Sequence, residues 1–216
     1  AMGAKIEGLG SRKIYIQGVD SLKTAKHTII SDRIVAGTYI ILAIMLNCKF
    51  EVKNVNTHHI KSLIDVLKRM GCELNVSNNS VKVSPSKKLK SCNIETAPYP
   101  GFPTDLQAQL MVLMTRAQGK STIKESIFEN RFMHVPELKR MGANIEIKNK
   151  IAIIQGPSKL TGAEVMATDL RASVSLVLAG LAADNRTIIN RIYHLDRGYE
   201  FLEKKLKNCK ARIKRI

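Results

Sequence analysis

An internal repeat is the feature that most constrains the fold of this chain. The segment LKRMGCELNV (67–76) is echoed by LKRMGANIEI (138–147), and LKNCKARIKR (206–215) is a weaker third copy. The copies lie about 70 residues apart, which is longer than a typical solenoid repeat. Three units of this size predict a three-fold arrangement around a shared core.

Each unit contains a polar start followed by a long apolar run. The three runs are SDRIVAGTYIILAIML (31–46), TDLQAQLMVLMTRAQG (104–119) and TDLRASVSLVLAGLAA (168–183). Each begins with Ser or Thr, then Asp, and its apolar residues then cover almost the whole circumference of a helix. Such a helix must be buried. The pattern therefore predicts an α/β protein with three wholly buried helices inside.

The rest of the unit is predicted to be a strand, an amphipathic helix and two closing strands. Gly71 and Gly142 suit a left-handed helix C-cap. Tight turns are expected at 77–79 and 149–150, between the closing strands. Residues 2–18 resemble the tail of a preceding unit, and the third unit stops before its second closing strand. We expect the C-terminal part of a longer or split protein.

The strongest compositional signal is charge. Lys and Arg total 35 against 18 Asp and Glu, a formal net charge of +17. This balance favours anionic partners such as nucleic acid, an acidic membrane face or phosphorylated metabolites. Aromatic residues are only 5% and Trp is absent, so a stacking surface for single-stranded nucleic acid is poorly supplied. Nucleic acid is therefore an unfavoured partner.

The sequence carries no sign of membrane insertion or secretion. No apolar stretch reaches the roughly 18 to 20 residues of a spanning helix. The four cysteines and five histidines show no metal-ligand spacing, so no metal site is expected. There is no Gly-rich phosphate loop and no catalytic triad. A cytoplasmic protein with reduced thiols is the plain interpretation.

Three acids, Asp32, Asp105 and Asp169, occupy the same place in the repeat. One interpretation is structural, because Asp at a helix start accepts backbone N–H bonds and stabilises the helix by roughly 0.5–2 kcal/mol. The other is chemical, because neighbouring helix N-termini attract anions and a hydrogen-bonded acid there is positioned for proton transfer. Periodicity alone leaves both open.

Two arginines, Arg131 and Arg197, also occupy equivalent places in successive units. Arginine grips carboxylate or phosphate with two parallel hydrogen bonds. The alternative is a surface ion pair with Glu129 or Asp196, worth under about 1 kcal/mol. Arg171 follows Asp169 by two residues, and a local pair between them is a further possibility.

Four blocks resemble a known family: APYPGFPTDLQAQ, FENRFMHVPELKRMGA, ATDLRASVSLVLAGLAA and RIYHLDRGYE. They are similar to the enolpyruvyl transferases, and within them to the bacterial UDP-N-acetylglucosamine 1-carboxyvinyltransferases of peptidoglycan synthesis. The resemblance implies a lobe that is an inside-out α/β barrel of three βαβαββ repeats, with helices inside and sheets outside. It implies transfer of the enolpyruvyl group of phosphoenolpyruvate to the sugar 3′-hydroxyl, with no metal or organic cofactor.

The resemblance also implies roles for particular residues. Asp105 matches the proposed base at the 3′-hydroxyl, and it shares the nucleotide-sugar site with Ile127. Arg131 and Arg197 match arginines around phosphoenolpyruvate and its phosphate. Asp169 and Arg171 match a supporting pair.

The family's active site lies between two lobes, and this chain matches one of them. Residues 1–28 are expected to be a remnant of the N-terminal lobe, and residues 29–216 the C-terminal lobe, made of three repeats without its last strand. The reactive-loop cysteine, a lysine-asparagine pair and further arginines belong to the missing part. The chain alone is thus expected to be inactive. The alternatives are a solitary lobe that binds an anionic ligand or partner without catalysis, and a nucleic-acid-binding protein.

Overall fold

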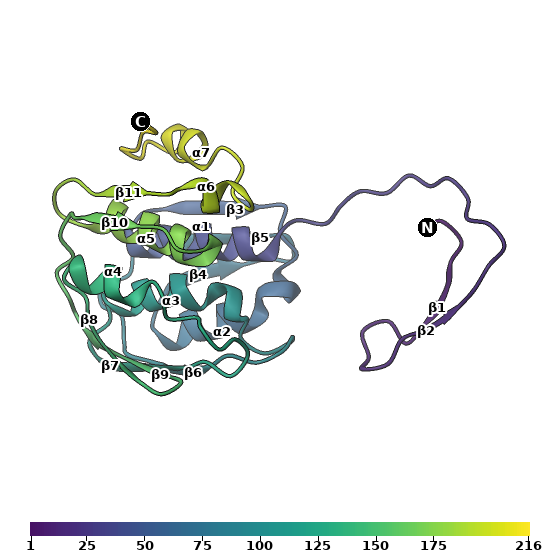
Figure 1. Ribbon diagram of the computed structural model, residues 1–216, viewed down its shortest axis with the longest axis horizontal. Coiled ribbons are helices and arrows are strands. Elements are labelled where there is room, and N and C mark those ends of the chain that lie inside the picture. Colours follow the sequence, from purple (N-terminus) through teal and green to yellow (C-terminus); the bar gives the residue numbers. More distant parts are fainter. The chain divides into compact units, whose positions relative to one another are not determined.

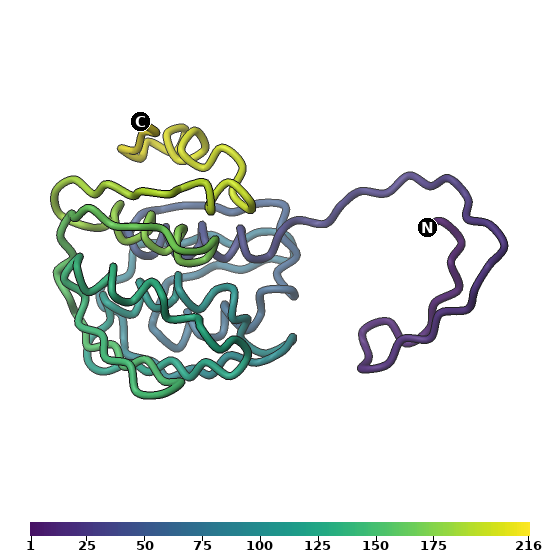
Figure 2. Tube along the Cα trace, in the orientation of Figure 1, coloured from purple at the N-terminus to yellow at the C-terminus, as the bar shows by residue number.

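The computed structural model describes residues 1–216 and divides them into two compact units, residues 1–31 and residues 32–216. The smaller unit contains one antiparallel hairpin, formed by β1 (Lys5–Glu7) and β2 (Tyr15–Gln17), in which Ile6 is paired with Ile16. Figures 1 and 2 show the ribbon and the chain trace.

The middle repeat of the larger unit contains the complete βαβαββ set. Its elements are β6 (Asn93–Glu95), α3 (Gln107–Met114), β7 (Gly119–Lys124), α4 (Val135–Arg140), β8 (Asn144–Lys148) and β9 (Ile151–Gly156). The four strands form one sheet of order β6-β7-β9-β8, parallel between β6 and β7 and antiparallel elsewhere. This element order is the one that the resemblance implies.

The first repeat lacks the opening strand. Its elements are α1 (Arg33–Met45), β3 (Phe50–Lys53), the 3₁₀ turn η1 (Thr57–Ile60), α2 (Lys61–Arg69), β4 (Glu73–Val76) and β5 (Ser80–Ser84). The three strands form an antiparallel sheet of order β3-β5-β4.

The third repeat is the shortest. It consists of β10 (Glu164–Met166), α5 (Leu170–Ala182), β11 (Ile188–Asn190), α6 (Tyr193–Asp196) and α7 (Leu202–Asn208). Its two strands pair in parallel. Residues 209–216 contain no strand, so the expected first closing strand of this unit was wrong.

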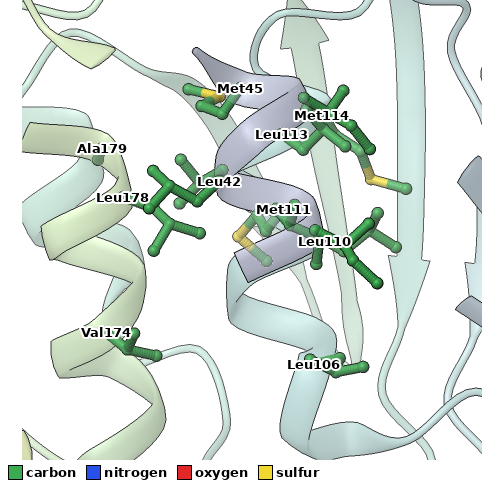
Figure 3. Close-up of a cluster of buried hydrophobic side chains, with 14 of the residues drawn as sticks. Leu42, Met45, Leu106, Leu110, Met111, Leu113, Met114, Val174, Leu178 and Ala179 are labelled. Atoms are coloured by element: carbon green, nitrogen blue, oxygen red, sulfur yellow. The ribbon is translucent and has the colours of Figure 1, made fainter. Parts of the chain in front are cut away.

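The helices α1, α3 and α5 form the centre of the larger unit. Every residue of α3 is buried, as are most residues of α1 and α5. Figure 3 shows Leu42 of α1, Leu110 and Met111 of α3 and Leu178 of α5 among the side chains that fill the space between these helices. Strands such as β5 and β9 alternate between buried and more exposed residues, so each sheet covers the core with one face. The prediction of helices inside and sheets outside is confirmed.

Backbone conformations at the predicted turns also agree with the repeat. Gly71 and Gly142 follow the amphipathic helices α2 and α4 with φ of +82° and +93°, the left-handed C-cap that glycine tolerates best. Asn149, between β8 and β9, has φ of +55°, as a tight hairpin turn requires.

Candidate active site

The three repeated aspartates have different roles. Asp32 is the N-cap of α1, and its carboxylate accepts hydrogen bonds from the backbone nitrogens of Ile34 (2.7 Å) and Val35 (3.0 Å). Asp169 caps α5 in the same way, through Arg171 N (2.7 Å) and Ala172 N (3.0 Å). For these two acids the capping interpretation is confirmed.

Asp105 does not cap a helix. It lies inside a 3₁₀ turn, η2 (Thr104–Leu106), whose N-cap is Pro103. Its side chain makes no capping hydrogen bond to the backbone of this turn and is available for contacts with other segments. Oδ1 accepts a hydrogen bond from Arg131 Nη2 at 2.6 Å and forms an ion pair with Arg171 Nε at 3.2 Å. Oδ2 has no hydrogen-bond or ion-pair partner within the chain.

Arg131 lies in the turn between β7 and α4, and it is held from three sides. Its Nη2 pairs with Asp105, its Nε donates to Thr104 Oγ1 at 3.1 Å, and its guanidinium carbon lies 4.8 Å from the centre of the Phe128 ring. The side chain is only 13% exposed. The alternative of a surface pair with Glu129 was therefore wrong.

Arg171 lies in the first turn of α5. Its backbone nitrogen donates to the Asp169 cap, but its guanidinium pairs with Asp105, a residue of the neighbouring repeat. The expected local pair with Asp169 was therefore wrong. Asp169 stabilises the start of the helix from which Arg171 reaches Asp105. Asp105, Arg131 and Arg171 together carry one net positive charge, which suits an anionic substrate.

Arg197 forms no hydrogen bond or ion pair with the residues of this cluster. It is exposed, it follows α6, and it forms no ion pair in the chain. Asp196 pairs instead with Arg215 at 2.6 Å, so the alternative of an Arg197–Asp196 pair was wrong. The exposed guanidinium is free to bind another group.

Ile127 follows β7 and is 44% exposed. Its backbone nitrogen donates to Glu125 Oε1 at 2.9 Å. Glu125 is 2% exposed, and sequence analysis missed it. Strand alternation in STIKESIF places Glu125 on the same inward face as Ser121 and Ile123, and this was the signal that could have found it.

His134 lies immediately before α4 and is 1% exposed. Burial lowers the pKa of its imidazole to about 4, and the negative charge of Asp169 opposes that shift only in part. Its Nε2 has no hydrogen-bond partner. The imidazole is therefore neutral near pH 7, and it lies next to the turn that contains Arg131.

The buried His134 should make the fold sensitive to acid. Above pH 6.5 the imidazole is neutral in the folded and unfolded chain, whereas below it only the unfolded chain gains a proton until the pH nears 4. The free energy of unfolding should thus fall by about 2 kcal/mol between pH 7 and pH 5 from this group. Urea unfolding at both pH values measures it. His134→Gln should remove that part of the fall, and the exposed His58→Gln should not.

Two cavities of the lobe lie away from the Asp105 cluster. They have volumes of about 110 and 380 Å³, and both include Arg116, which follows α3. The larger cavity also includes Met45 and Ala182, at the C-terminal ends of α1 and α5. The Asp105 cluster lies instead beside the N-terminal ends of α3 and α5, and it lines neither of these two cavities.

The fold offers neither a metal cluster nor a membrane-spanning helix. No group of three or more His, Cys, Asp or Glu side chains is placed to hold a metal ion. None of the helices combines the length and apolar character needed to cross a bilayer.

The chain is similar to known proteins over its whole length. Residues 1–206 match the family described as EPSP synthase (3-phosphoshikimate 1-carboxyvinyltransferase). UDP-N-acetylglucosamine 1-carboxyvinyltransferases from Pelagibacter ubique and Halothermothrix orenii are 52% and 54% identical, each covering 100% of this chain and 52% of the relative. The crystal structure of the enolpyruvyl transferase NikO from Streptomyces tendae superimposes with a TM-score of 0.89 at 29% identity, covering 99% of this chain and 51% of that one.

These comparisons agree with the fold and with the sequence blocks. The chain spans about half the length of the curated relatives it matches. The match over residues 1–206, together with the three-repeat lobe, shows that the chain belongs to the EPSP synthase family of enolpyruvyl transferases.

Proposed function

We propose that this chain is the C-terminal part of a two-lobe transferase that moves the enolpyruvyl group of phosphoenolpyruvate to the 3′-hydroxyl of UDP-N-acetylglucosamine. The proposal takes its substrates from the relatives with 52–54% identity. It places the protein in the cytoplasm, in peptidoglycan precursor synthesis and thus in cell wall biogenesis, cell shape, the cell cycle and cell division. No cofactor is required by this reaction.

The observation that carries the proposal is the state of the Asp105 carboxylate. Two arginines hold Oδ1, whereas Oδ2 has no partner in the chain and the side chain is 36% exposed. A carboxylate that is fixed through one oxygen and open at the other is oriented to accept a proton from a bound hydroxyl. Asp32 also has no hydrogen-bond partner at Oδ2, but its Oδ1 is held by backbone nitrogens of its own helix and not by arginines.

The proposed reaction uses Asp105 as the base. Asp105 takes the proton of the sugar 3′-hydroxyl while that oxygen bonds to C2 of phosphoenolpyruvate and C3 gains a proton. The tetrahedral intermediate then loses phosphate from C2 and a proton from C3, which restores the double bond. Arg131 and the exposed Arg197 are proposed to bind the phosphoenolpyruvate and its phosphate, and Ile127 the nucleotide sugar.

The acceptor specificity tests this proposal directly. A protein that joins this chain to the half its relatives carry in addition should release phosphate from phosphoenolpyruvate when UDP-N-acetylglucosamine is present. Shikimate 3-phosphate is the matched alternative acceptor, because the family description names that activity. Release with shikimate 3-phosphate alone would reject the proposed acceptor. Ligand binding without release from either acceptor would favour a solitary binding lobe.

We also propose that residues 1–28 belong to another lobe, as the closing hairpin of a preceding repeat. Support comes from the β8–β9 hairpin, which the β1–β2 hairpin matches in register. Ile6 pairs with Ile16 as Ile145 pairs with Ile154, and Gly3 has φ of +92° where Gly142 has +93°.

The two hairpins differ in burial. Ile145 and Ile154 are 2% and 0% exposed against their own repeat, whereas Ile6 and Ile16 are 39% and 71% exposed. We infer that the apolar face of β1–β2 packs on the sheet and helix of another repeat. The proposed partner is the missing half of the transferase.

Gly18 offers a test of this docking. Its counterpart Gly156 lies so close to the C-terminal end of α3 that a Cβ there would lie no more than 3.0 Å from the carbonyl oxygens of Ala117, Thr115 and Met114, whereas nothing lies within 4 Å of a Cβ at Gly18. Gly18→Ala should leave the melting temperature of this chain unchanged. It should weaken association with the separately produced other half by about 5- to 150-fold, the equivalent of an overpacking cost of 1–3 kcal/mol.

Gly156→Ala is the matched control for the Gly18 substitution. The same added methyl group should destabilise the lobe itself, by about 1–3 kcal/mol in urea unfolding. An unchanged dissociation constant for Gly18→Ala, measured by titration calorimetry, would contradict the proposed docking.

A further inference from the structure

Glu125 is a buried acid with no cationic partner. It follows β7 and is 2% exposed. Its carboxylate accepts four hydrogen bonds, from Thr96 Oγ1 (2.7 Å), Thr104 Oγ1 (2.9 Å), Ile127 N (2.9 Å) and Phe128 N (3.0 Å). An ionised carboxylate accepts about four bonds and donates none. The surroundings of Glu125 therefore match a carboxylate fully, with four donors from three separate segments.

This carboxylate fixes the direction of the Thr104 hydroxyl. Thr104 Oγ1 lies between Glu125 Oε2 and Arg131 Nε, at 2.9 and 3.1 Å. Because a guanidinium only donates and a carboxylate only accepts, the hydroxyl must donate to Glu125 and accept from Arg131. The oxygen lone pair is thereby aimed at Arg131.

We propose that Glu125 is a positioning residue for the Asp105 carboxylate. The connection runs from Glu125 through Thr104 to Arg131, whose other end holds Asp105 Oδ1 at 2.6 Å. A second arm runs from Glu125 to the backbone nitrogens of Ile127 and Phe128. Glu125 thus joins the proposed base to the proposed nucleotide-sugar contact. This role rests on the proposed function.

Only a carboxylate serves both arms. A glutamine has one acceptor oxygen and brings two N–H donors of its own. If its oxygen keeps the backbone nitrogens, its amide faces Thr104 and the threonine hydroxyl loses its acceptor. Arg131 then loses the oriented lone pair that anchors Nε. A displacement of about 1 Å at a reacting group can lower turnover by about 100-fold.

The test compares variants of the two-lobe protein in the phosphate-release assay. Thr104→Val breaks only the arm to Arg131, so kcat should fall by about 10- to 100-fold while KM for UDP-N-acetylglucosamine stays within about 3-fold. Thr104→Ser, which keeps the hydroxyl, should restore kcat. Glu125→Gln breaks both arms, so it should lower kcat and also raise that KM.

Glu95→Gln is the matched control. Glu95 accepts from Ser126 Oγ at 2.6 Å and pairs with Lys124 at 3.0 Å in the same region, but it contacts neither Thr104 nor Arg131. Its kcat should equal that of the unmodified protein. If Glu125→Gln does not fold, the Thr104→Val and Thr104→Ser pair still decides the role.

Two outcomes separate this role from the proposed function. An active protein in which Thr104→Val keeps the unmodified kcat, or in which Thr104→Ser fails to restore it, would overturn the role of Glu125 alone. An unmodified two-lobe protein that releases no phosphate with UDP-N-acetylglucosamine or with shikimate 3-phosphate would overturn the proposed function, and the positioning role would fall with it.

Discussion

Asp105→Asn in the two-lobe protein is expected to lower kcat by roughly 10²- to 10⁴-fold, which corresponds to about 3–5 kcal/mol of activation barrier. The amide keeps the shape of the side chain and can still accept from Arg131, but it cannot take the proton of the sugar hydroxyl. Binding of UDP-N-acetylglucosamine should weaken far less than turnover. Because the Asp105 side chain is 36% exposed, its ion pairs should contribute only about 1 kcal/mol to stability.

The matched control for this substitution is Asp32→Asn. Asp32 has the same place in the repeat, but its carboxylate caps α1 through Ile34 N and Val35 N. Asparagine caps helices about as well as aspartate, so stability and turnover should both stay close to those of the unmodified protein. Steady-state kinetics and thermal melts of the two variants measure the difference. Near-normal turnover in Asp105→Asn would leave Asp105 with a structural role only.

The sequence predicted the parts of the fold that depend on local patterns. Apolar residues on every side of residues 104–119 require burial wherever the segment is placed, and α3 is indeed buried throughout. Gly71 and Gly142 follow amphipathic helices, where only a left-handed cap explains a glycine, and both have positive φ. Such features depend only on residues that lie within about ten positions of one another in the sequence.

The sequence did not predict which aspartate would be free of its helix. The segments SDR (31–33), TDL (104–106) and TDL (168–170) look alike, yet Asp105 alone lies inside a 3₁₀ turn that begins after Pro103. Its carboxylate pairs with Arg131 and Arg171, which come from later segments of the chain. Periodicity carries no information about such tertiary pairing. The resemblance to enolpyruvyl transferases singled out Asp105 as the base, but it did not predict these ion pairs.

Glu125 illustrates the same limit in a stronger form. Alternation along STIKESIF places it on the inward face with Ile123, but the sequence does not show what would make burial of an acid possible there. Its burial follows from Thr96 and Thr104, which lie 29 and 21 residues earlier and supply hydroxyl donors. A charged residue can be buried only where such donors converge, and their convergence is a property of the folded lobe.

The chain on its own is expected to release no phosphate from phosphoenolpyruvate and UDP-N-acetylglucosamine above the uncatalysed background. The Asp105 side chain is 36% exposed in this chain, so water would not be excluded from the substrates. The chain also spans only about half the length of its relatives, so groups that the other half contributes are missing.

Mixing the chain with the separately produced other half should restore activity in proportion to the complex formed. The restored rate should rise with the concentration of the other half, as set by the affinity with which the β1–β2 hairpin docks on it. Gly18→Ala should therefore raise the concentration needed for half-maximal activity without changing the rate at saturation. Asp105→Asn should do the reverse, because its docking surface is intact and its base is lost. Circular dichroism of each variant confirms that an inactive mixture contains folded chains. Turnover by the chain alone at a rate near that of the two-lobe protein would show that all reacting groups lie within residues 1–216, and that the shared active site is wrong.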